Sequence, residues 1–266
     1  MWIVSQIGAR EHYSIPRALQ QSNQLGALLT DFWVPPGSLL EKLPVGQKLR
    51  DRHHPDISPE FVWAPNRKSL LFEVGQRIKK DALWTKIQKK NQSFQQHAIP
   101  QLHRLASSLT ADAQPTLFGY SYAARDLFRV AKELGWKTIL GQIDPGPSEH
   151  ALVDRLADEF PEWSSFVLPQ PPQSYWNNWH EECELADEII VNSFWSAKLL
   201  GESGIPADKL RVIPLAYEGV APKSHKKNYH NRPLRLLFLG QAIVRKGIHD
   251  LVAAASNLDP KDWNID

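Results

Sequence analysis

Two kinds of hydrophobic pattern alternate along the chain. In the first, short runs are apolar almost throughout, as in KTIL at residues 137–140, EIIV at 188–191 and RVIPL at 211–215. In the second, apolar residues recur at helical spacing, as in the segment 122–135, which ends at Gly135. Continuously apolar runs are typical of strands buried on both faces, and their alternation with helices is typical of βαβ units. The pattern therefore predicts an α/β protein with a Rossmann-like parallel sheet covered by helices on both faces.

This reading assigns an element to most of the first 216 residues. Strands are expected at residues 2–5, 25–33, 115–121, 136–142, 187–193 and 210–216, and helices at 14–24, 68–108 (one helix or two), 122–135, 148–160, 175–186 and 194–204. Residues 35–65 are rich in Pro, Gly and charge, so little regular structure is expected there.

The alternation of expected strands and helices, first interrupted at residues 35–65, is interrupted a second time near the end of the chain. Residues 218–233 are polar and basic and contain two prolines, as an interdomain connection does, and a strand–turn–helix pattern restarts at Leu234. We therefore expect an N-terminal Rossmann-like domain at 1–220, a linker at 221–233, and at 234–266 the first βα unit of a second Rossmann-like domain.

Composition narrows the class of protein only a little. The 266 residues carry 31 basic and 29 acidic side chains, without the localised basic excess expected of a nucleic-acid-binding domain. Cys183 is the single cysteine, so no intrachain disulfide can form. The N-terminus lacks the pattern of a signal peptide, and no apolar run is long enough for a transmembrane helix. These features favour a cytoplasmic protein.

The restarted pattern carries candidate chemistry. LLFLG leads through QAIVRKG into a helix, and a helix start favours a phosphate through its unpaired N–H groups and its dipole. Lys246 and Arg245 add positive charge at the same turn. Taken alone, the pair is also what two solvated basic residues at a helix start look like.

Two segments together make the chain resemble a known family. The segment 184–220 contains ADEIIVNS and KLRVIPLA, and the segment 234–258 reads LRLLFLGQAIVRKGIHDLVAAASNL. Both resemble the retaining glycosyltransferases of the group 1 (family 4) type, which have the GT-B fold of two Rossmann-like domains.

The resemblance implies a hexosyltransferase-type enzyme that uses a UDP- or GDP-linked sugar and a glycan or lipid-linked acceptor. It implies that Lys246 contacts the donor diphosphate and that Gly240 and Gly247 form the turn around it. Gln241 stands where the family usually has an arginine, and Arg245 is the adjacent candidate to replace that charge. No metal and no cofactor besides the nucleotide sugar is expected.

The family's acidic motif, a pair of glutamates that orients the donor sugar, would lie beyond Asp266. The chain is therefore expected to be a truncated and inactive fragment of such an enzyme. The alternative is a non-catalytic glycan- or lipid-binding module derived from one. A dinucleotide-binding epimerase or dehydrogenase is disfavoured because no G-x-G-x-x-G follows the first strand.

Three loops of the N-terminal domain follow expected strands, where α/β sheets bind ligands. Gly8, Arg10 and His12 lie in the first loop and are candidates for contact with acceptor or phosphate. Tyr120 and Ser121 are candidates to line the acceptor cleft, with local capping as the alternative. Asp144 is the candidate catalytic base or sugar-hydroxyl ligand, and its alternative is an Asx-Pro turn that starts a helix.

Residues 77–90 form a strongly basic stretch. Six basic residues stand against Asp81 alone, and Ile78, Leu83, Trp84 and Ile87 would form an apolar strip on a helix. Such a helix suits an anionic membrane, so contact with the inner membrane face is one expectation. A solvated helix face is the other, and binding to nucleic acid would require steep salt dependence.

Overall fold

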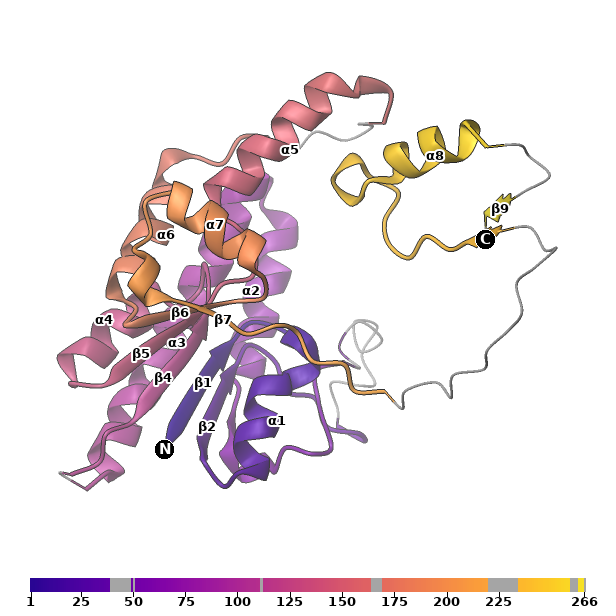
Figure 1. Ribbon diagram of the computed structural model, residues 1–266. Helices are drawn as coiled ribbons and strands as arrows, with labels where there is room; N and C mark the ends of the chain where they lie inside the picture. The colour runs from indigo at the N-terminus through magenta and orange to yellow at the C-terminus, as the bar shows by residue number, and fades with distance from the viewer. Residues whose placement is uncertain are drawn as a thin grey trace. The chain divides into compact units, whose positions relative to one another are not determined.

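The computed structural model describes residues 1–38, 49, 51–110, 112–163, 169–219, 234–258 and 263–265. By its internal contacts the chain divides into two units. Unit 1 comprises Met1–Pro145 and Gln170–Pro214, and unit 2 comprises Gly146–Pro169 and Leu215–Asp266 (Figure 1). The expected linker at 221–233 lies outside the described residues, and the division at residue 220 stays a prediction. The pattern did not anticipate that residues 146–169 group with the C-terminal segment.

Unit 1 is built on one parallel sheet. Its seven strands lie in the order β3-β2-β1-β4-β5-β6-β7, and every neighbouring pair is parallel. The strands are β1 (Trp2–Gln6), β2 (Leu25–Thr30), β3 (Val62–Trp63), β4 (Thr116–Tyr120), β5 (Lys137–Gly141), β6 (Glu188–Val191) and β7 (Leu210–Val212). The α/β fold class predicted from the apolar runs is confirmed. Only β3 was not expected, since it lies in the segment read as irregular.

Helices cover both faces of this sheet. They are α1 (Ser14–Gln21), α2 (Asn66–Ile78), α3 (Leu83–Ser108), α4 (Arg125–Glu133), α6 (Gln173–Leu185) and α7 (Phe194–Glu202). The expected segment 68–108 is thus two helices, and α4 starts three residues later than expected.

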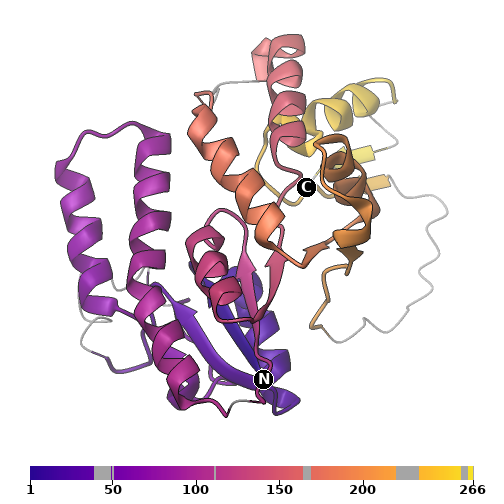
Figure 2. The same ribbon diagram turned by 90° about the vertical axis from the view of Figure 1, so that its left-hand side faces the viewer.

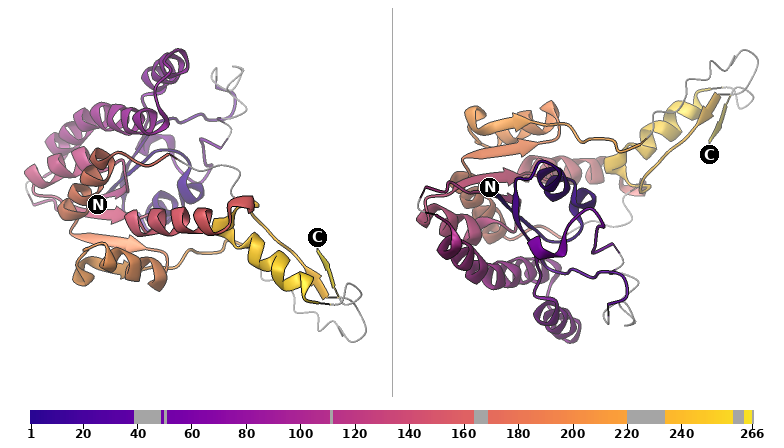
Figure 3. Two further views of the ribbon diagram at one scale, coloured as in Figure 1. Left: turned by 90° about the horizontal axis from the view of Figure 1, so that it is seen from above. Right: turned by 90° about the horizontal axis from the view of Figure 1, so that it is seen from below.

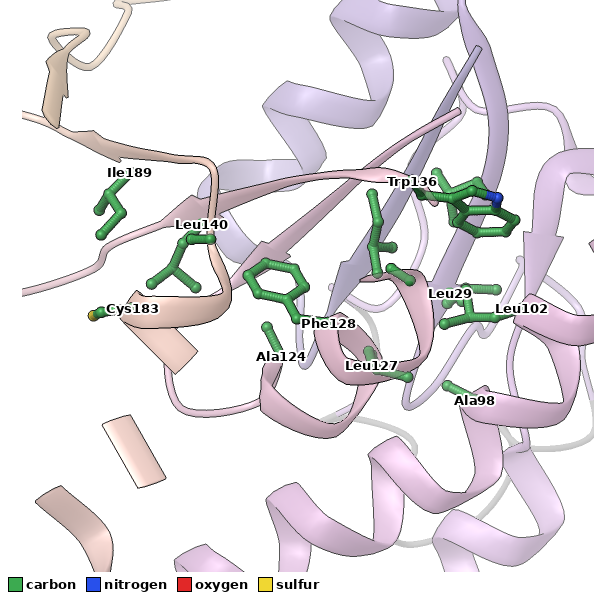
Figure 4. Packing of buried hydrophobic residues seen from close by; sticks show 14 of the residues in the cluster. Leu29, Ala98, Leu102, Ala124, Leu127, Phe128, Trp136, Leu140, Cys183 and Ile189 are labelled. Atoms are coloured by element: carbon green, nitrogen blue, oxygen red, sulfur yellow. The ribbon is translucent and has the colours of Figure 1, made fainter. Parts of the chain in front are cut away.

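Successive strand residues enter two different cores, which explains why the strands are continuously apolar. On β1, Ile3 packs with α3, α4 and α6, whereas Val4 packs in a second cluster with residues of α1. On β5, Leu140 belongs to the first cluster and Ile139 to the second. Figure 4 shows the first cluster, where Phe128 lies beside Leu140 between the sheet and α4. A strand with core on both sides therefore favours apolar residues on both of its faces.

The strand order places a reversal between β1 and β4. From β1 the chain proceeds outward through β2 to β3, and then returns to add β4 to β7 on the other side of β1. In open α/β sheets, ligands bind beyond the carboxyl ends of the strands at such a switch point. The loops after β1 and β4 are therefore the first place in unit 1 to search for a site.

Unit 2 contains α5 (Pro147–Glu159), β8 (Leu234–Leu236), a short 3-10 turn η7 (Val244–Lys246), α8 (Ile248–Ser256) and β9 (Trp263–Ile265). Strands β8 and β9 pair in parallel with α8 between them, which is a βαβ unit as the restarted pattern predicts. Strand β8 is shorter than the apolar run LRLLFLG that predicted it, and Leu239, which follows the strand, is 85% exposed. Within the described ranges, no helix combines the length and the apolar character needed to span a bilayer.

Candidate functional site

The loop after β1 has an unusual backbone. Gly8 has φ 85°, and Glu11, His12 and Tyr13 have φ between 49° and 61°. Left-handed conformations are disfavoured for residues with a Cβ, and such strain concentrates at functional sites. The expected residues of this loop, Arg10 and His12, are exposed at its surface. The loop thus lies at the sheet's switch point with stored backbone strain.

Gly8 is held in place by a buried carboxylate. Its N–H donates to Asp31 Oδ1 at 2.8 Å, and Arg52 Nη1 donates to the same oxygen at 3.0 Å. A Cβ at Gly8 would lie 2.9 Å from Arg52 Nη1. The positive φ therefore favours glycine, and a Cβ there would also displace the end of the Arg52 side chain from Asp31.

Buried polar atoms without partners gather along β1 and after β2. Four of the eight buried side-chain atoms that find no hydrogen-bond partner among the described residues lie here: Ser5 Oγ, Gln6 Oε1, Asp31 Oδ2 and Trp33 Nε1. Buried polar groups in native proteins are nearly always paired with protein, water or ligand. Their density at the carboxyl ends of β1 and β2 marks this edge as a place where water or a ligand completes the structure.

Tyr120 and Ser121 connect the loops at this edge. The Tyr120 hydroxyl donates to Glu11 Oε2 at 3.3 Å, which joins the end of β4 to the loop after β1. Burial, and then the nearby Glu11 carboxylate, raises the pKa of Tyr120, so its hydroxyl stays protonated at neutral pH. Ser121 is buried, and its Oγ accepts the N–H of Ile143 at 3.3 Å. Ser121 thus ties the β4 and β5 loops together.

Asp144 lies at the carboxyl end of β5 and is oriented by Tyr122. The Tyr122 hydroxyl donates to Asp144 Oδ1 at 2.6 Å, and the Gln142 side chain donates to the Asp144 carbonyl at 2.8 Å. Tyr122 has φ 74° and stacks on Tyr175 with 4.9 Å between ring centroids. Asp144 is therefore a positioned, half-buried carboxylate, as an acid–base group needs to be, although its catalytic role stays a prediction.

In unit 2, both glycines of the turn from Gly240 to Gly247 have positive φ. Gly240 has φ 148° and Gly247 has φ 72°, and Gly247 is the N-cap of α8. Gln241, Arg245 and Lys246 are all exposed. The first N–H groups of α8 and the two basic side chains therefore occupy one short turn.

The two basic residues of this turn differ in their ion pairing. Arg245 Nη1 forms an ion pair with Glu149 Oε1 of α5 at 2.8 Å. Lys246 has no ion-pair partner in the part of the chain that the structure describes. The charge that would replace the family's arginine is thus already engaged, whereas the lysine charge is available to an anion.

A polar pocket of about 280 Å³ in unit 1 was not expected from the sequence. We call it the amide pocket because five of its twelve lining residues carry carboxamides. The lining consists of Thr85, Gln88, Lys89, Asn91, Gln92, Gln95, Tyr122, Arg125, Tyr175, Asn178, Trp179 and Glu182. These residues come from α3, α6, the loop after β4 and the start of α4. No local sequence signal could have joined them, because they meet only through helix packing.

Glu182 organises the floor of the amide pocket. Its carboxylate accepts the backbone N–H groups of Tyr122 at 2.6 Å, Ala124 at 2.6 Å and Arg125 at 2.9 Å. Burial raises the pKa of Glu182 to about 7, although the three N–H donors oppose that shift. Glu182 is thus the side chain that holds the loop after β4 and caps the start of α4.

The basic stretch 77–90 spans the end of one helix and the start of the next, which is the two-helix alternative for residues 68–108. Helix α2 ends at Ile78 and α3 begins at Leu83, and Trp84 turns inward to pack on Tyr175 at 4.9 Å. The apolar strip lies instead mainly on α2, where Leu71, Val74 and Ile78 are exposed (73%, 47% and 79%). Figures 2 and 3 show α2 at the periphery of unit 1, beside α3.

We call Leu71, Val74 and Ile78 the α2 stripe. They are spaced three and four residues apart and so share one helix face. Exposed basic side chains lie around it, at Arg67, Lys68, Arg77, Lys79 and Lys80. Exposed apolar residues that share a face of a helix with several basic side chains are a candidate interaction surface.

No family model and no curated protein matches the chain. Among solved structures, it is similar to a complex between a UDP-glucosyltransferase from Polygonum tinctorium capable of glucosylating indoxyl and 3,4-dichloroaniline, with 19% identity over 83% of this chain and a TM-score of 0.40. It is also similar to Phytolacca americana UGT2 complexed with UDP-2fluoro-glucose and pterostilbene, with 15% identity over 90% of this chain and a TM-score of 0.41. The chain spans 53% and 60% of the length of these two proteins.

Proposed function

We propose that the protein is a glycosyltransferase of the hexosyltransferase type. It takes a sugar from a UDP- or GDP-linked donor and adds it to a glycan or lipid-linked acceptor with retention of anomeric configuration. The donor diphosphate lies at the turn from Gly240 to Gly247, and the acceptor lies at the carboxyl edge of the sheet in unit 1.

The available charge of Lys246 at the start of α8 carries this proposal. Lys246 is exposed, while Arg245 beside it is paired with Glu149 at 2.8 Å. Gly247 opens α8 with a positive φ, so N–H groups of the helix start lie next to the lysine in sequence. A diphosphate gains both the helix dipole and a full positive charge at such a turn. This supports a site for the anionic part of a nucleotide sugar.

The proposed transfer depends more on stabilising the charge of the leaving diphosphate than on a protein nucleophile. As the glycosidic bond of the donor breaks, negative charge grows on the departing diphosphate, and donors aimed at that charge lower the barrier. Lys246 and the first N–H groups of α8 have this role. Asp144, held by Tyr122, is the group in unit 1 that accepts the proton of an acceptor hydroxyl or binds that hydroxyl.

A donor screen tests the proposed reaction. The protein is incubated with UDP- and GDP-sugars and with a panel of glycan and lipid-linked acceptors, and products are measured by mass. A mass increase of one hexosyl unit, dependent on both donor and acceptor, is the expected result. Failure of every UDP- and GDP-sugar to bind would contradict the proposal, whereas binding of a donor without transfer would favour the inactive fragment or the non-catalytic module that the sequence also predicts.

A second candidate function, favoured by the α2 stripe, is binding to an anionic membrane surface without transfer. Its exposed apolar residues and the surrounding basic residues are complementary to acidic lipid headgroups over an apolar interior. The two functions are compatible, since an enzyme with a lipid-linked acceptor has to reach the membrane. Product formation distinguishes an enzyme from a binding module alone.

A further inference from the structure

We propose that the amide pocket binds one neutral sugar ring. Five of its twelve lining residues carry carboxamides, at Gln88, Asn91, Gln92, Gln95 and Asn178, and three are aromatic, at Tyr122, Tyr175 and Trp179. The pocket is formed by unit 1 alone, so the inference stands or falls independently of the donor site.

The pocket does not suit an anion. Its two cationic residues are already paired, Lys89 with Asp81 at 2.7 Å and Arg125 with Asp126 at 2.8 Å. The N–H groups at the start of α4 are also taken, because Glu182 accepts three of them and Gln95 Oε1 accepts that of Asp126 at 2.7 Å. Among these groups, a phosphate or carboxylate would find neither an unpaired cationic side chain nor an unpaired backbone N–H.

The pocket does not suit a cation or an apolar molecule either. Both oxygens of Glu182 accept backbone N–H groups, and the side chain is only 1% exposed, so it offers little to a cation. An apolar ligand would strip water from the carboxamides without replacing their hydrogen bonds, which is costly.

Neutral hydroxyl groups of a ligand match the carboxamides that are left unpaired in the pocket. A carboxamide both donates and accepts, as a sugar hydroxyl does, so each pair fits in either direction. Among the described residues, the side chains of Asn91 and Gln92 make no hydrogen bond within the chain, and Asn178 uses its Oδ1 for Arg125 and leaves its NH₂ group. These groups lie on two facing helices, α3 and α6, and so reach a ligand from both sides.

The aromatic residues and the size of the pocket complete the match. Tyr175 packs between Tyr122 and Trp84, with 4.9 Å between ring centroids in each pair, and forms a rigid apolar wall. The C–H face of a sugar ring packs on such a wall while its hydroxyls point to the amides. A volume of about 280 Å³ is small for a drug-sized ligand and fits a single ring.

Titration of neutral glycosides tests the proposal. Methyl glycosides of glucose, galactose and mannose are added to the whole protein and followed by NMR or calorimetry, with glucose 6-phosphate as the charged comparison. At least one neutral glycoside is expected to bind saturably, and the phosphate form at least about tenfold more weakly.

Two variants locate the binding. Gln92→Ala removes one exposed carboxamide and is expected to weaken binding roughly three- to tenfold, the effect of one hydrogen bond. Thr85→Trp fills the pocket and is expected to abolish glycoside binding. The matched control is Gln96→Ala, an exposed glutamine one turn along the same helix that does not line the pocket. Binding should survive there.

The inference is overturned if none of the neutral glycosides binds, if glucose 6-phosphate binds more tightly than they do, or if Thr85→Trp or Gln92→Ala leaves affinity unchanged. Thermal unfolding of each variant checks that it is folded. Affinity for UDP- and GDP-sugars is measured in parallel, because loss of that binding in Lys246→Ala, with glycoside binding intact, separates the donor proposal from this one.

Discussion

The hydroxyl of Tyr122 donates a hydrogen bond of 2.6 Å to Oδ1 of Asp144. This bond joins the loop after β4 to the loop after β5, at the edge of the sheet where the candidate site lies. Tyr122 reaches it from a left-handed backbone conformation, with φ 74°. Its ring also lines the amide pocket, so one residue belongs to both candidate sites of unit 1.

Tyr122→Phe should therefore lower stability without changing the packing of the ring. The variant removes a hydrogen bond to a carboxylate, and we expect the free energy of unfolding to fall by about 1–2 kcal/mol in urea denaturation. Tyr217→Phe is the control, because Tyr217 is 82% exposed. Equal stability of both variants would mean that the Tyr122–Asp144 bond is not formed in solution.

Glu182 should make stability depend on pH. Burial raises its pKa to about 7 in the folded protein from 4.5, so the folded state binds the proton more tightly than the unfolded state does. Its contribution is therefore complete below about pH 4.5 and is lost as the pH rises to about 7, amounting to roughly 3 kcal/mol at most.

The matched pair for this prediction is Glu182→Gln and Glu181→Gln. The first should be destabilised, because its NH₂ group faces a backbone N–H, and should lose this part of the pH dependence. Glu181→Gln removes a half-buried carboxylate paired with Arg129 and should keep the wild-type pH dependence. Chemical denaturation at several pH values measures the slope. A slope that is the same in wild type and Glu182→Gln would contradict the assignment.

Gly8 and Gly75 should respond to alanine with opposite signs. Gly8→Ala places a Cβ 2.9 Å from Arg52 Nη1 at a residue with φ 85°, and we expect a loss of about 1–2 kcal/mol. Gly75 lies inside α2 with open space around its Cα, so Gly75→Ala should gain about 0.5–1 kcal/mol. Thermal unfolding measures both. A Gly8→Ala variant as stable as wild type would show that the β1 loop adopts another backbone conformation.

The α2 stripe predicts binding to acidic vesicles. Vesicles with about one third anionic lipid should bind the protein, and Leu71→Ser with Ile78→Ser should weaken binding at least about tenfold, because each exposed side chain loses a gain of roughly 1.5–3 kcal/mol on burial. Co-sedimentation at two salt concentrations measures the fraction of protein bound to the vesicles. Phe194→Ser, at an exposed residue of α7, is the control and should bind normally. Equal binding to neutral vesicles would rule out the charge complementarity.

The sequence predicts the parts of this fold that local pattern determines. Strands such as β1 and β5 are buried on both faces and therefore read as continuous apolar runs. Strand β3 has only two residues, Val62 and Trp63, which is too short to show any period. The start of α4 was placed too early because Tyr122 is held in a left-handed conformation, and its N–H is bound by Glu182 on a helix far along the chain.

The candidate site is likewise predictable only where it follows strand ends. Tyr120 ends a strand and Gly8, Ser121 and Asp144 follow strands, as the pattern indicates, and their roles in binding or catalysis stay predictions. The partners that orient them were not predictable. Asp31 and Arg52 around Gly8, and Tyr122 at Asp144, are polar residues whose contacts depend on tertiary packing. The amide pocket has no sequence signature for the same reason.

The donor site is tested most directly by calorimetric titration of UDP-glucose and a GDP-sugar into wild type, Lys246→Ala and the control Lys198→Ala. Lys198 has a side chain that is 73% exposed on α7, away from the turn in sequence. We predict that one donor binds wild type and Lys198→Ala equally, and binds Lys246→Ala about 1.5–3 kcal/mol more weakly, the scale of a charge-assisted hydrogen bond. Equal affinity in all three proteins, or no affinity of wild type for either donor, would contradict the account.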